Sequence, residues 1–447
     1  MGRLVLALVV SLLGAAAALL PAPVIETPAF SGVSPVQPAA TRAGGSGVSY
    51  CPWALADTAH DTLLTLASLA PATAGVSFPS GGEVGDRSEL ELAGPSSTGL
   101  LVSGIRLAGD APAVVEFSDG PAAATALLRG PAVLAGDLCP GSIPKLWQLP
   151  GGSTREGERL SLRLFNPFPE DAKVSIAGVS EFGAEAPPQY EGLTVASRGW
   201  RDLNLNETLD LREQLALTVS TSQGLIVPAL ILATEGDRAT WPGTGQSEVW
   251  ELPLVRVGSL SPILAVRNSG SSDVAVTVDA FGTGGPAPGV VSQVVAAGTE
   301  ARISLDGLAE PPFGVRVQGD GPLSVVVLGQ GDRLRAATPG VSRTARRWLV
   351  PGFGAEGPAR HDLWVLNSGG EPITVSIRPL DAEGTVGAVD KVAVPAGTIR
   401  QVPVDEAAPV RVGLGGVVVE SLAPFSVAWS AEMEGAVAYL TALPVGD

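Results

Sequence analysis

One pattern recurs along this chain at intervals of about a hundred residues. Each copy begins with Trp, any residue, Leu or Val, and Pro, and continues with an apolar stretch that ends in Asn. A period this long exceeds that of a solenoid repeat and matches the size of a sandwich domain. The three copies start at Trp147, Trp250 and Trp348, which are 103 and 98 residues apart, and their asparagines are Asn166, Asn268 and Asn367.

A degenerate fourth copy precedes these three. Trp53 lies 94 residues before Trp147, and residues 105–112 resemble residues 315–322, two periods later. The sequence therefore predicts four tandem modules, of which the first is degenerate. Their predicted boundaries are residues 49–146, 147–247, 248–346 and 347–447.

The modules are predicted to be β-sandwiches of the immunoglobulin-like kind, in a mostly β chain. Residues 274–278 and 373–377 alternate apolar with small polar side chains, which is typical of strands with one buried face. The 56 glycines and 38 prolines favour short strands joined by many turns. Val375 is placed on an inward strand face. Within the modules, residues 58–69 and 207–216 are expected to be helical.

The repeated Trp and Asn residues are predicted to be structural. An Asn directly after a strand opens a turn through its side-chain carbonyl. The alternative for the tryptophans is a platform on which sugars stack. We expect packing at the start of a module, or between modules, for Trp53, Trp147, Trp250 and Trp348.

Residues 1–23 are predicted to form a transmembrane or signal helix. The run Leu4–Leu20 has 17 residues without a charge. It makes about 25 Å of helix, and no clean cleavage site follows it. We favour an uncleaved anchor, which makes this a single-pass protein of the cell membrane with an extracytoplasmic C-terminal part. The alternative is a cleaved signal peptide and a secreted protein. Residues 24–48, rich in Pro and Gly, are predicted to be a linker.

The chain has two cysteines, Cys51 and Cys139, which are 88 residues apart and each followed by proline. This spacing fits neither a metal site nor a Cys-x-x-Cys redox motif. In the oxidising compartment that export implies, we expect a structural disulfide between them.

The formal net charge is −17, from 28 basic and 45 acidic residues. No basic patch can dominate so acidic a surface, which argues against a nucleic-acid binder. The expected partners are the membrane, through the N-terminal helix, and an envelope protein or polysaccharide.

No catalytic motif is present, and no catalytic, cofactor-binding or metal-binding residue is predicted. The two histidines, His60 and His361, fall in different modules and are expected to be surface or packing residues. Residues 206–208, Asn-Glu-Thr, form a glycosylation sequon.

The Trp-x-Leu-Pro starts, the strand-Asn-Pro/Ser turns, the Ala-Gly-Thr segments and the Cys-Pro pair together resemble the DUF5719 family of actinobacterial envelope proteins of unknown function. The resemblance covers roughly residues 49–445. It implies an anchored or secreted protein with no known activity.

Two interpretations of function follow. We expect a non-enzymatic, membrane-anchored envelope protein whose β-modules serve as a spacer or binding scaffold. The alternative is a carbohydrate-binding or carbohydrate-active envelope protein, which an exposed aromatic platform or a cleft with paired carboxylates would favour.

Overall fold

A computed structural model describes residues 47–106, 109–255, 259–331, 335–352, 360–385, 390–404 and 415–446. The predicted N-terminal helix, residues 1–23, and all but the last two residues of the predicted linker lie outside these ranges. Within them, no helix is both long enough and apolar enough to cross a membrane. The described chain is mostly β, and its contacts group it into one compact unit.

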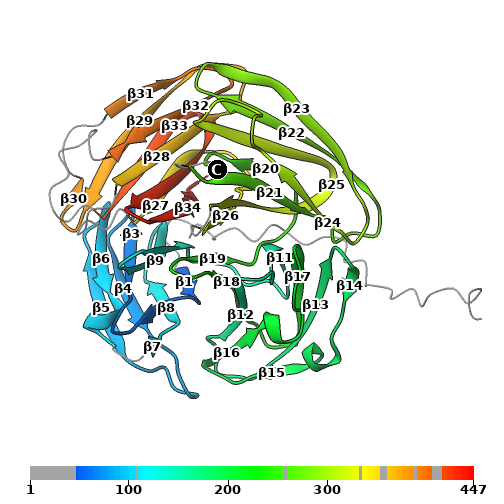
Figure 1. The fold of residues 1–447 in the computed structure, drawn as a ribbon. Helices are drawn as coiled ribbons and strands as arrows, with labels where there is room; N and C mark the ends of the chain where they lie inside the picture. The colour runs from blue at the N-terminus through cyan, green and yellow to red at the C-terminus, as the bar shows by residue number, and fades with distance from the viewer. Residues whose placement is uncertain are drawn as a thin grey trace, which may run out of the picture. The chain divides into compact units, whose positions relative to one another are not determined.

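The strands form four groups, which we name repeats 1 to 4, and each group starts one or two residues before a predicted module (Figure 1). Repeat 1 comprises β1 (Gly47–Cys51), β2 (Leu55–Ala56), β3 (Asp61–Ser68), β4 (Ala72–Ser77), β5 (Arg87–Leu92), β6 (Ser96–Leu101), the 3-10 helix η1 (Val102–Gly104), β7 (Gly109–Asp110), β8 (Ala113–Phe117), β9 (Ala122–Gly130) and β10 (Val133–Leu138). Repeat 2 comprises β11 (Leu146–Gly152), β12 (Arg159–Asn166), β13 (Ala172–Ser180), β14 (Gly183–Glu185), η2 (Pro188–Tyr190), β15 (Leu193–Val195), β16 (Gly199–Asn204), η3 (Leu205–Glu207), β17 (Leu215–Gln223), β18 (Val227–Ala233) and β19 (Arg238–Pro242).

Repeats 3 and 4 each contain one long strand of 18 residues, β25 and β33 respectively. Repeat 3 comprises β20 (Ser247–Leu252), β21 (Ser261–Arg267), β22 (Val274–Gly282), β23 (Gly285–Val295), β24 (Glu300–Ser304), β25 (Phe313–Gln330) and β26 (Arg335–Pro339). Repeat 4 comprises β27 (Ala345–Pro351), β28 (Arg360–Asn367), β29 (Ile373–Asp381), β30 (Gly384–Thr385), β31 (Asp390–Val394), β32 (Thr398–Pro403), β33 (Gly416–Met433), β34 (Ala436–Thr441) and β35 (Leu443–Pro444).

One strand order recurs in the repeats. In repeat 2, one sheet has the order β11-β17-β13-β14, and the other has the order β16-β12-β18-β19. In repeat 3, β20 and β22 flank the first half of β25, whereas β21 and β26 flank its second half. The strand β33 is shared in the same way in repeat 4. Repeat 1 has the matching orders β1-β8-β4-β5 and β10-β9-β3, with β6 on β3.

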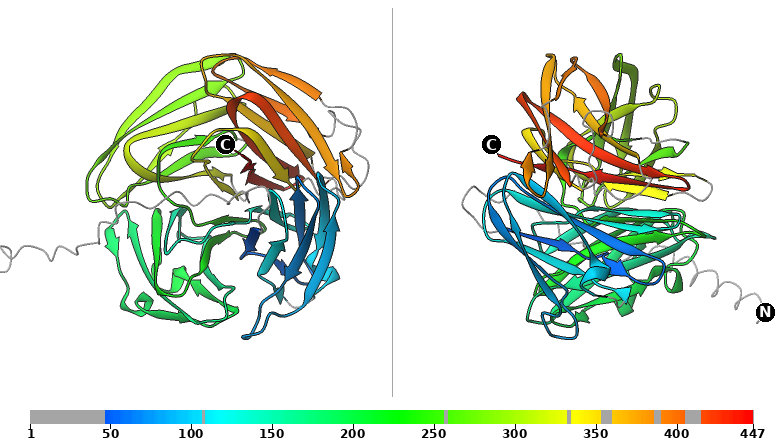
Figure 2. Two further views of the ribbon diagram at one scale, coloured as in Figure 1. Left: turned by 180° about the vertical axis from the view of Figure 1, so that it is seen from behind. Right: turned by 90° about the vertical axis from the view of Figure 1, so that its left-hand side faces the viewer.

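The four repeats close on one another through the strands β10, β19, β26 and β34, which we call the junction strands. Contacts run from β10 to β19, from β19 to β26, from β26 to β34, and from β34 back to β10. Figure 1 shows β19, β26 and β34 side by side. Both views of Figure 2 show repeat 1, in blue, against repeat 4, in orange and red. The circuit of contacts is therefore closed between the first and last repeats.

Apolar burial holds each repeat together and also joins neighbours. Val375 is fully buried in the cluster of repeat 4, which confirms its predicted inward position. The cluster of repeat 3 takes in Trp364 and Tyr439 of repeat 4. Ala67 of repeat 1 shares a smaller cluster with Leu349 of repeat 4. Burying apolar surface between repeats stabilises the junctions as it does the cores.

Both predicted helices are wrong. Residues 58–69 contain the strand β3, which lies between β9 and β6. Seven of its eight residues are buried, so the alternation of a half-exposed strand is absent from its sequence. Residues 207–216 contain the end of η3, a turn and the start of β17.

Candidate functional site

The repeated tryptophans fasten the opening strand of a repeat to its second sheet. Burial leaves each indole with at most 2% exposure, so none offers a ring face to a sugar. A buried indole N–H needs an acceptor, and here each Nε1 donates to a backbone carbonyl just where the chain enters the second sheet. The bonds are Trp147 to Ile226 at 3.1 Å, Trp250 to Leu323 at 2.9 Å and Trp348 to Phe425 at 3.0 Å.

Repeat 1 departs from this arrangement. Trp53 follows the strand β1 instead of lying in it. Its Nε1 donates to the carbonyl of Ala126 at 2.9 Å, in the middle of β9. The structure thus gives Trp53 a similar packing role at a position that is not equivalent to the other three.

The repeated asparagines open turns, as predicted. In each, the side-chain carbonyl accepts from the backbone N–H two residues later, and the amide nitrogen donates to two or three backbone carbonyls across the turn. These side chains are at most 1% exposed, and their bonds hold the turn. The N–H donors belong to Phe168, Gly270 and Gly369 for Asn166, Asn268 and Asn367 respectively, at 3.0, 2.9 and 3.1 Å.

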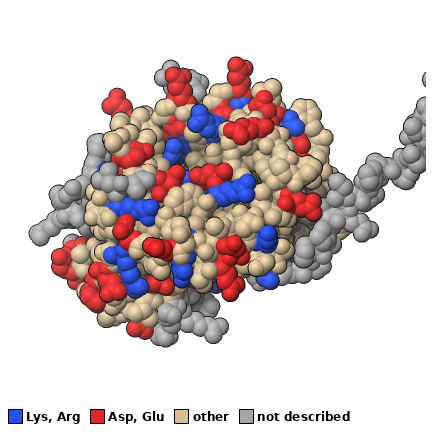
Figure 3. Space-filling model, turned by 90° about the horizontal axis from the view of Figure 1, so that it is seen from below, with Lys and Arg blue, Asp and Glu red and all other residues tan. Residues whose placement is uncertain are grey.

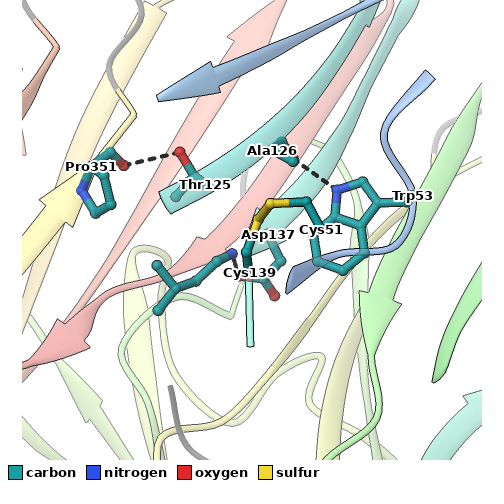
Figure 4. The surroundings of a disulfide bond; sticks show 8 residues. Cys51, Trp53, Thr125, Ala126, Asp137, Cys139 and Pro351 are labelled. Atoms are coloured by element: carbon teal, nitrogen blue, oxygen red, sulfur yellow. Dashed lines mark hydrogen bonds between the residues drawn. A yellow bond between two sulfur atoms is a disulfide. The ribbon is translucent and has the colours of Figure 1, made fainter. Parts of the chain in front are cut away.

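The predicted disulfide between Cys51 and Cys139 is confirmed, and both residues are fully buried. It joins the end of β1 to the residue after β10, so it fixes the first junction strand to the start of repeat 1. Figure 4 shows Thr125 beside it, with its hydroxyl directed at the carbonyl of Pro351 in repeat 4. The disulfide therefore lies at the place where repeats 1 and 4 meet.

A small cavity lies where the four repeats meet. One proline from each repeat lines it, namely Pro140, Pro242, Pro339 and Pro444. Its volume is about 30 Å³. This volume holds about two water molecules and is far smaller than a site for an organic ligand.

Asp137 is the buried charge at the junction of repeats 4 and 1. Its Oδ1 accepts from the backbone N–H and the hydroxyl of Thr441 in repeat 4, both at 2.8 Å. Its Oδ2 accepts from the hydroxyl of Thr338 in repeat 3 at 3.0 Å. Burial disfavours the charged form and raises the pKa of Asp137 to about 6, although these hydrogen bonds act in the opposite direction.

Arg163 in β12 is the buried charge at the junction of repeats 1 and 2. It binds Asp202 of its own repeat through two bonds, of 2.7 and 2.6 Å. Its Nη2 also donates to Asp110 of repeat 1 at 2.6 Å. Burial alone would lower the pKa of Arg163, but the two carboxylates outweigh burial and raise it.

Arg335, at the start of β26, joins repeat 3 to repeat 2. Its Nε donates to Glu158 at 2.9 Å, and its backbone N–H donates to Asp237 at 2.5 Å. Burial raises the pKa of Asp237 to about 7, even though hydrogen bonds and the charge of Arg335 favour the ionised form.

Glu251 in β20 joins repeat 3 to repeat 4. Its carboxylate accepts from the hydroxyl of Ser426 at 2.6 Å and also from the hydroxyl of Ser368. Burial raises the pKa of Glu251 against these two bonds. Each of the four junctions thus contains at least one buried charged side chain whose partners include residues of a neighbouring repeat.

The sequence alone did not indicate these four charged junction residues. They lie at positions that do not correspond between repeats, so no repeated motif marks them. The one signal in the sequence is a charge inside a run that is otherwise apolar or small, as for Asp137 in residues 133–138. Their chemistry is structural, because the charges are matched by donors and acceptors of the protein itself.

A family model matches residues 102–405, from η1 in repeat 1 into repeat 4. It describes DUF5719, a family of unknown function. The chain belongs to this family. The match covers about two thirds of the chain and is narrower than the expected residues 49–445. Among curated proteins, none matches this one.

The two histidines of this DUF5719 protein lie in different repeats. The Nδ1 of His60 lies 3.2 Å from a carboxylate oxygen of Asp57 at the surface. His361 is buried against Trp429, with ring centroids 5.5 Å apart. In the part of the chain that the structure describes, no group of three or more His, Cys, Asp or Glu residues is placed to hold a metal ion.

The glycosylation sequon of this DUF5719 protein is part of the fold. The amide nitrogen of Asn206 donates to the carbonyls of Thr154 and Glu158, at 3.2 and 2.8 Å. Its Oδ1 accepts from the backbone N–H of Leu160 at 2.8 Å. A glycan on this nitrogen would replace one of its two N–H donors and so remove one of the bonds that hold the start of β12.

Proposed function

We propose that this DUF5719 protein is a non-enzymatic, extracytoplasmic envelope protein, held in the cell membrane by residues 1–23, whose repeats together form a binding scaffold. The observation that carries the proposal is that the buried charged side chains at the junctions bind residues of neighbouring repeats. Asp137, Arg163, Glu251 and Arg335 bind partners in neighbouring repeats, so they fix the repeats against one another. A scaffold needs such fixed surfaces.

The disulfide supports the extracytoplasmic location. Cys51 and Cys139 are the chain's two cysteines, and they pair with each other at a fully buried position. Disulfides of this kind persist in oxidising compartments and are rare in the cytosol.

The closed circuit of contacts supports a scaffold over a spacer. A spacer gains reach when its modules follow one another in a line. Here β34 of repeat 4 contacts β10 of repeat 1, so the array returns to its start.

We further propose that each repeat is a β-sandwich of the immunoglobulin-like kind. The recurring pair of antiparallel sheets and the apolar cluster of each repeat support this assignment.

Location is tested by adding a tag to the C-terminus and treating spheroplasts with protease. The tag should be lost from the full-length protein, which should stay with the membrane fraction. A variant without residues 1–23 is the control, and its tag should stay protected in the cytoplasm. Protection of the tag in the full-length protein would contradict the proposal. N-terminal sequencing that starts beyond residue 18 would favour the secreted form.

A second experiment tests the proposal that the protein is not an enzyme. The purified protein, incubated with polysaccharide from the envelope, should release no new reducing ends. Release that grows with time and with protein concentration would overturn it in favour of a carbohydrate-active protein.

A further inference from the structure

An open groove runs over the surface of repeat 4, with a volume of about 460 Å³. This lies within the range of sites that take organic ligands. Side chains of three neighbouring strands, β27, β29 and β33, line it. They include Arg346, Arg347, Thr374, Ser376, Glu420 and Leu422.

The groove is basic in an acidic protein. Arg347 and Arg378 share the single carboxylate of Glu420, at 2.5 and 3.1 Å. Arg346 is exposed and makes no ion pair with a described residue. The lining has two arginines against one glutamate, an excess of one positive charge, and Arg378 adds another charge beside it, whereas the whole chain carries −17. On the face that Figure 3 shows, by contrast, acidic and basic side chains are interspersed.

Backbone geometry explains why these side chains gather. The register of β27 against β33 shifts between Ala345 and Arg347. At this irregularity in the pairing the successive residues Arg346 and Arg347 are both exposed, where a regular strand would bury one of them. On β29, Thr374, Ser376 and Arg378 alternate with buried residues and so share the outward face.

Among repeats 2, 3 and 4, which share the Trp motif, only repeat 4 has arginines at all three of these positions. Counting from the repeated Trp and from the strand register gives the equivalent positions of the three arginines. These are Glu248, Val249 and Asp279 in repeat 3, and Lys145, Leu146 and Ala177 in repeat 2. Because the scaffold is shared, the three arginines of repeat 4 are not required by the fold.

The edge of β27 is closed to strand addition. β35 pairs with Trp348 and Leu349, and the backbone N–H of Val445 donates to the carbonyl of Arg347 at 2.8 Å. A ligand in the groove therefore meets side chains rather than free backbone groups. This disfavours an extended acidic peptide, which binds a sheet edge through its main chain.

We propose that this groove binds an anionic polysaccharide, whose carboxylate or phosphate groups the arginines hold. Guanidinium groups match both anions with paired hydrogen bonds. The hydroxyls of Thr374 and Ser376 lie beside the arginines to meet sugar hydroxyls, and Leu422, 95% exposed at the rim, offers an apolar contact. This proposal rests on the proposed scaffold function, which places the protein in the cell envelope, and it names the class of ligand that the scaffold binds.

The test is binding of the full-length protein to defined polymers. Oligogalacturonate carries carboxylates, poly(glycerol phosphate) carries phosphates, dextran is neutral and polyglutamate is an acidic peptide. We expect the protein to bind at least one of the two anionic polymers, oligogalacturonate or poly(glycerol phosphate). The one that binds more tightly shows whether the groove prefers carboxylate or phosphate. Dextran should not bind, and polyglutamate should bind more weakly. Because the groove is open, the binding should weaken with added salt.

Matched variants distinguish binding at the groove from an effect of the protein's net charge. Arg346→Gln should weaken binding about tenfold, the loss of one charge-assisted hydrogen bond. Arg201→Gln, on the exposed surface of repeat 2, changes the net charge equally and should leave binding unchanged. Glu420→Gln should tighten binding, because it frees Arg347 and Arg378. Thermal unfolding checks that each variant is folded.

Three results would overturn the groove proposal. One is no binding of either anionic polysaccharide, and another is equal weakening by Arg346→Gln and Arg201→Gln. The third is polyglutamate binding as tightly as the polysaccharides, which would indicate an acidic protein as partner. Each of these can occur while the spheroplast experiment still places the protein outside the cytoplasm, so the two proposals fail separately.

Discussion

The carboxylate of Asp137 accepts two hydrogen bonds from Thr441, a residue 304 positions further along the chain. The first residue belongs to β10 of repeat 1 and the second to β34 of repeat 4. With the hydroxyl of Thr338 on its other oxygen, Asp137 binds three of the four repeats at one point. This contact is the clearest sign that the repeats form one assembly.

Replacing Asp137 by Asn should flatten the pH dependence of stability. Folding raises its pKa from 3.8 to about 6, so the unfolded chain releases this proton first. The stability that this group contributes is therefore full below about pH 3 and is lost as the pH rises through its folded pKa of about 6. The loss amounts to about 3 kcal/mol.

Urea unfolding of both proteins at pH 4 and pH 6.5 measures this effect. The change in the free energy of unfolding between the two pH values should differ by about 2 kcal/mol between wild type and Asp137→Asn, because the unfolded carboxyl is already partly ionised at pH 4. An identical change in both would show that Asp137 does not titrate in this range.

Replacing Arg163 by Met should loosen the junction of repeats 1 and 2. Removing one partner of a fully buried ion pair costs about 3–5 kcal/mol. Asp110 and Asp202 are 43% and 39% exposed, so water can solvate them, and we expect a loss of about 2 kcal/mol. Arg201→Met, on the neighbouring strand β16, is the control and should cost less than about 0.5 kcal/mol. Equal urea midpoints for the two variants would contradict this role.

Removing the disulfide with Cys51→Ala and Cys139→Ala should lower stability by up to about 4–5 kcal/mol, as loop closure predicts for its length. Guanidinium unfolding measures the loss. Peptide mapping of the exported wild type should find the two cysteines linked. Free thiols in protein recovered from an oxidising medium would refute the bond.

Changing Val375 to Asp should abolish cooperative unfolding, because an unpaired charge would enter the core of repeat 4. Thr374→Asp, one residue away and exposed on the same strand, is the matched control and should unfold like wild type. Circular dichroism during heating separates the two. A cooperative transition in Val375→Asp would show that the strand faces are misassigned.

Local rules in the sequence predicted the local structure. Asn166, Asn268 and Asn367 follow strands, and a short amide side chain after a strand opens a turn whatever lies further away. Val375 lies in a strand with one buried face, so apolar and polar residues alternate in its sequence and marked the strand. The strand β3 is buried on both faces, since Leu64 packs in the core of repeat 1 and Ala67 packs with Leu349 of repeat 4. Its sequence was taken for a helix because this burial, which removes the alternation of polar residues, depends on distant parts of the chain.

The junction charges could not be predicted for a related reason. Arg163 finds Asp110 across 53 residues, and Asp137 finds Thr338 across 201. Such pairs depend on how complete repeats meet, and each junction uses a different strand position. The basic groove was missed because its arginines become neighbours only when β27 and β29 lie on either side of β33.

The central claim is that repeat 4 closes onto repeat 1, and a cross-link tests it most directly. A Cβ atom placed on Gly435 would lie 3.9 Å from the Cβ of Ala132. This is within the about 3.5–4.5 Å that a disulfide requires. Gly435 and Gly157 have similar backbone angles, φ +78° and +81°, but no atom lies within 4 Å of a Cβ at Gly157. The pair Ala132→Cys and Gly157→Cys is therefore the control.

Peptide mapping of the full-length protein after oxidation gives the answer. We predict that the peptides around positions 132 and 435 are linked in the Ala132→Cys/Gly435→Cys variant, alongside the native Cys51–Cys139 bond. The control pair should stay unlinked. Free thiols at positions 132 and 435, in protein whose native disulfide is intact, would contradict the closure of the four repeats.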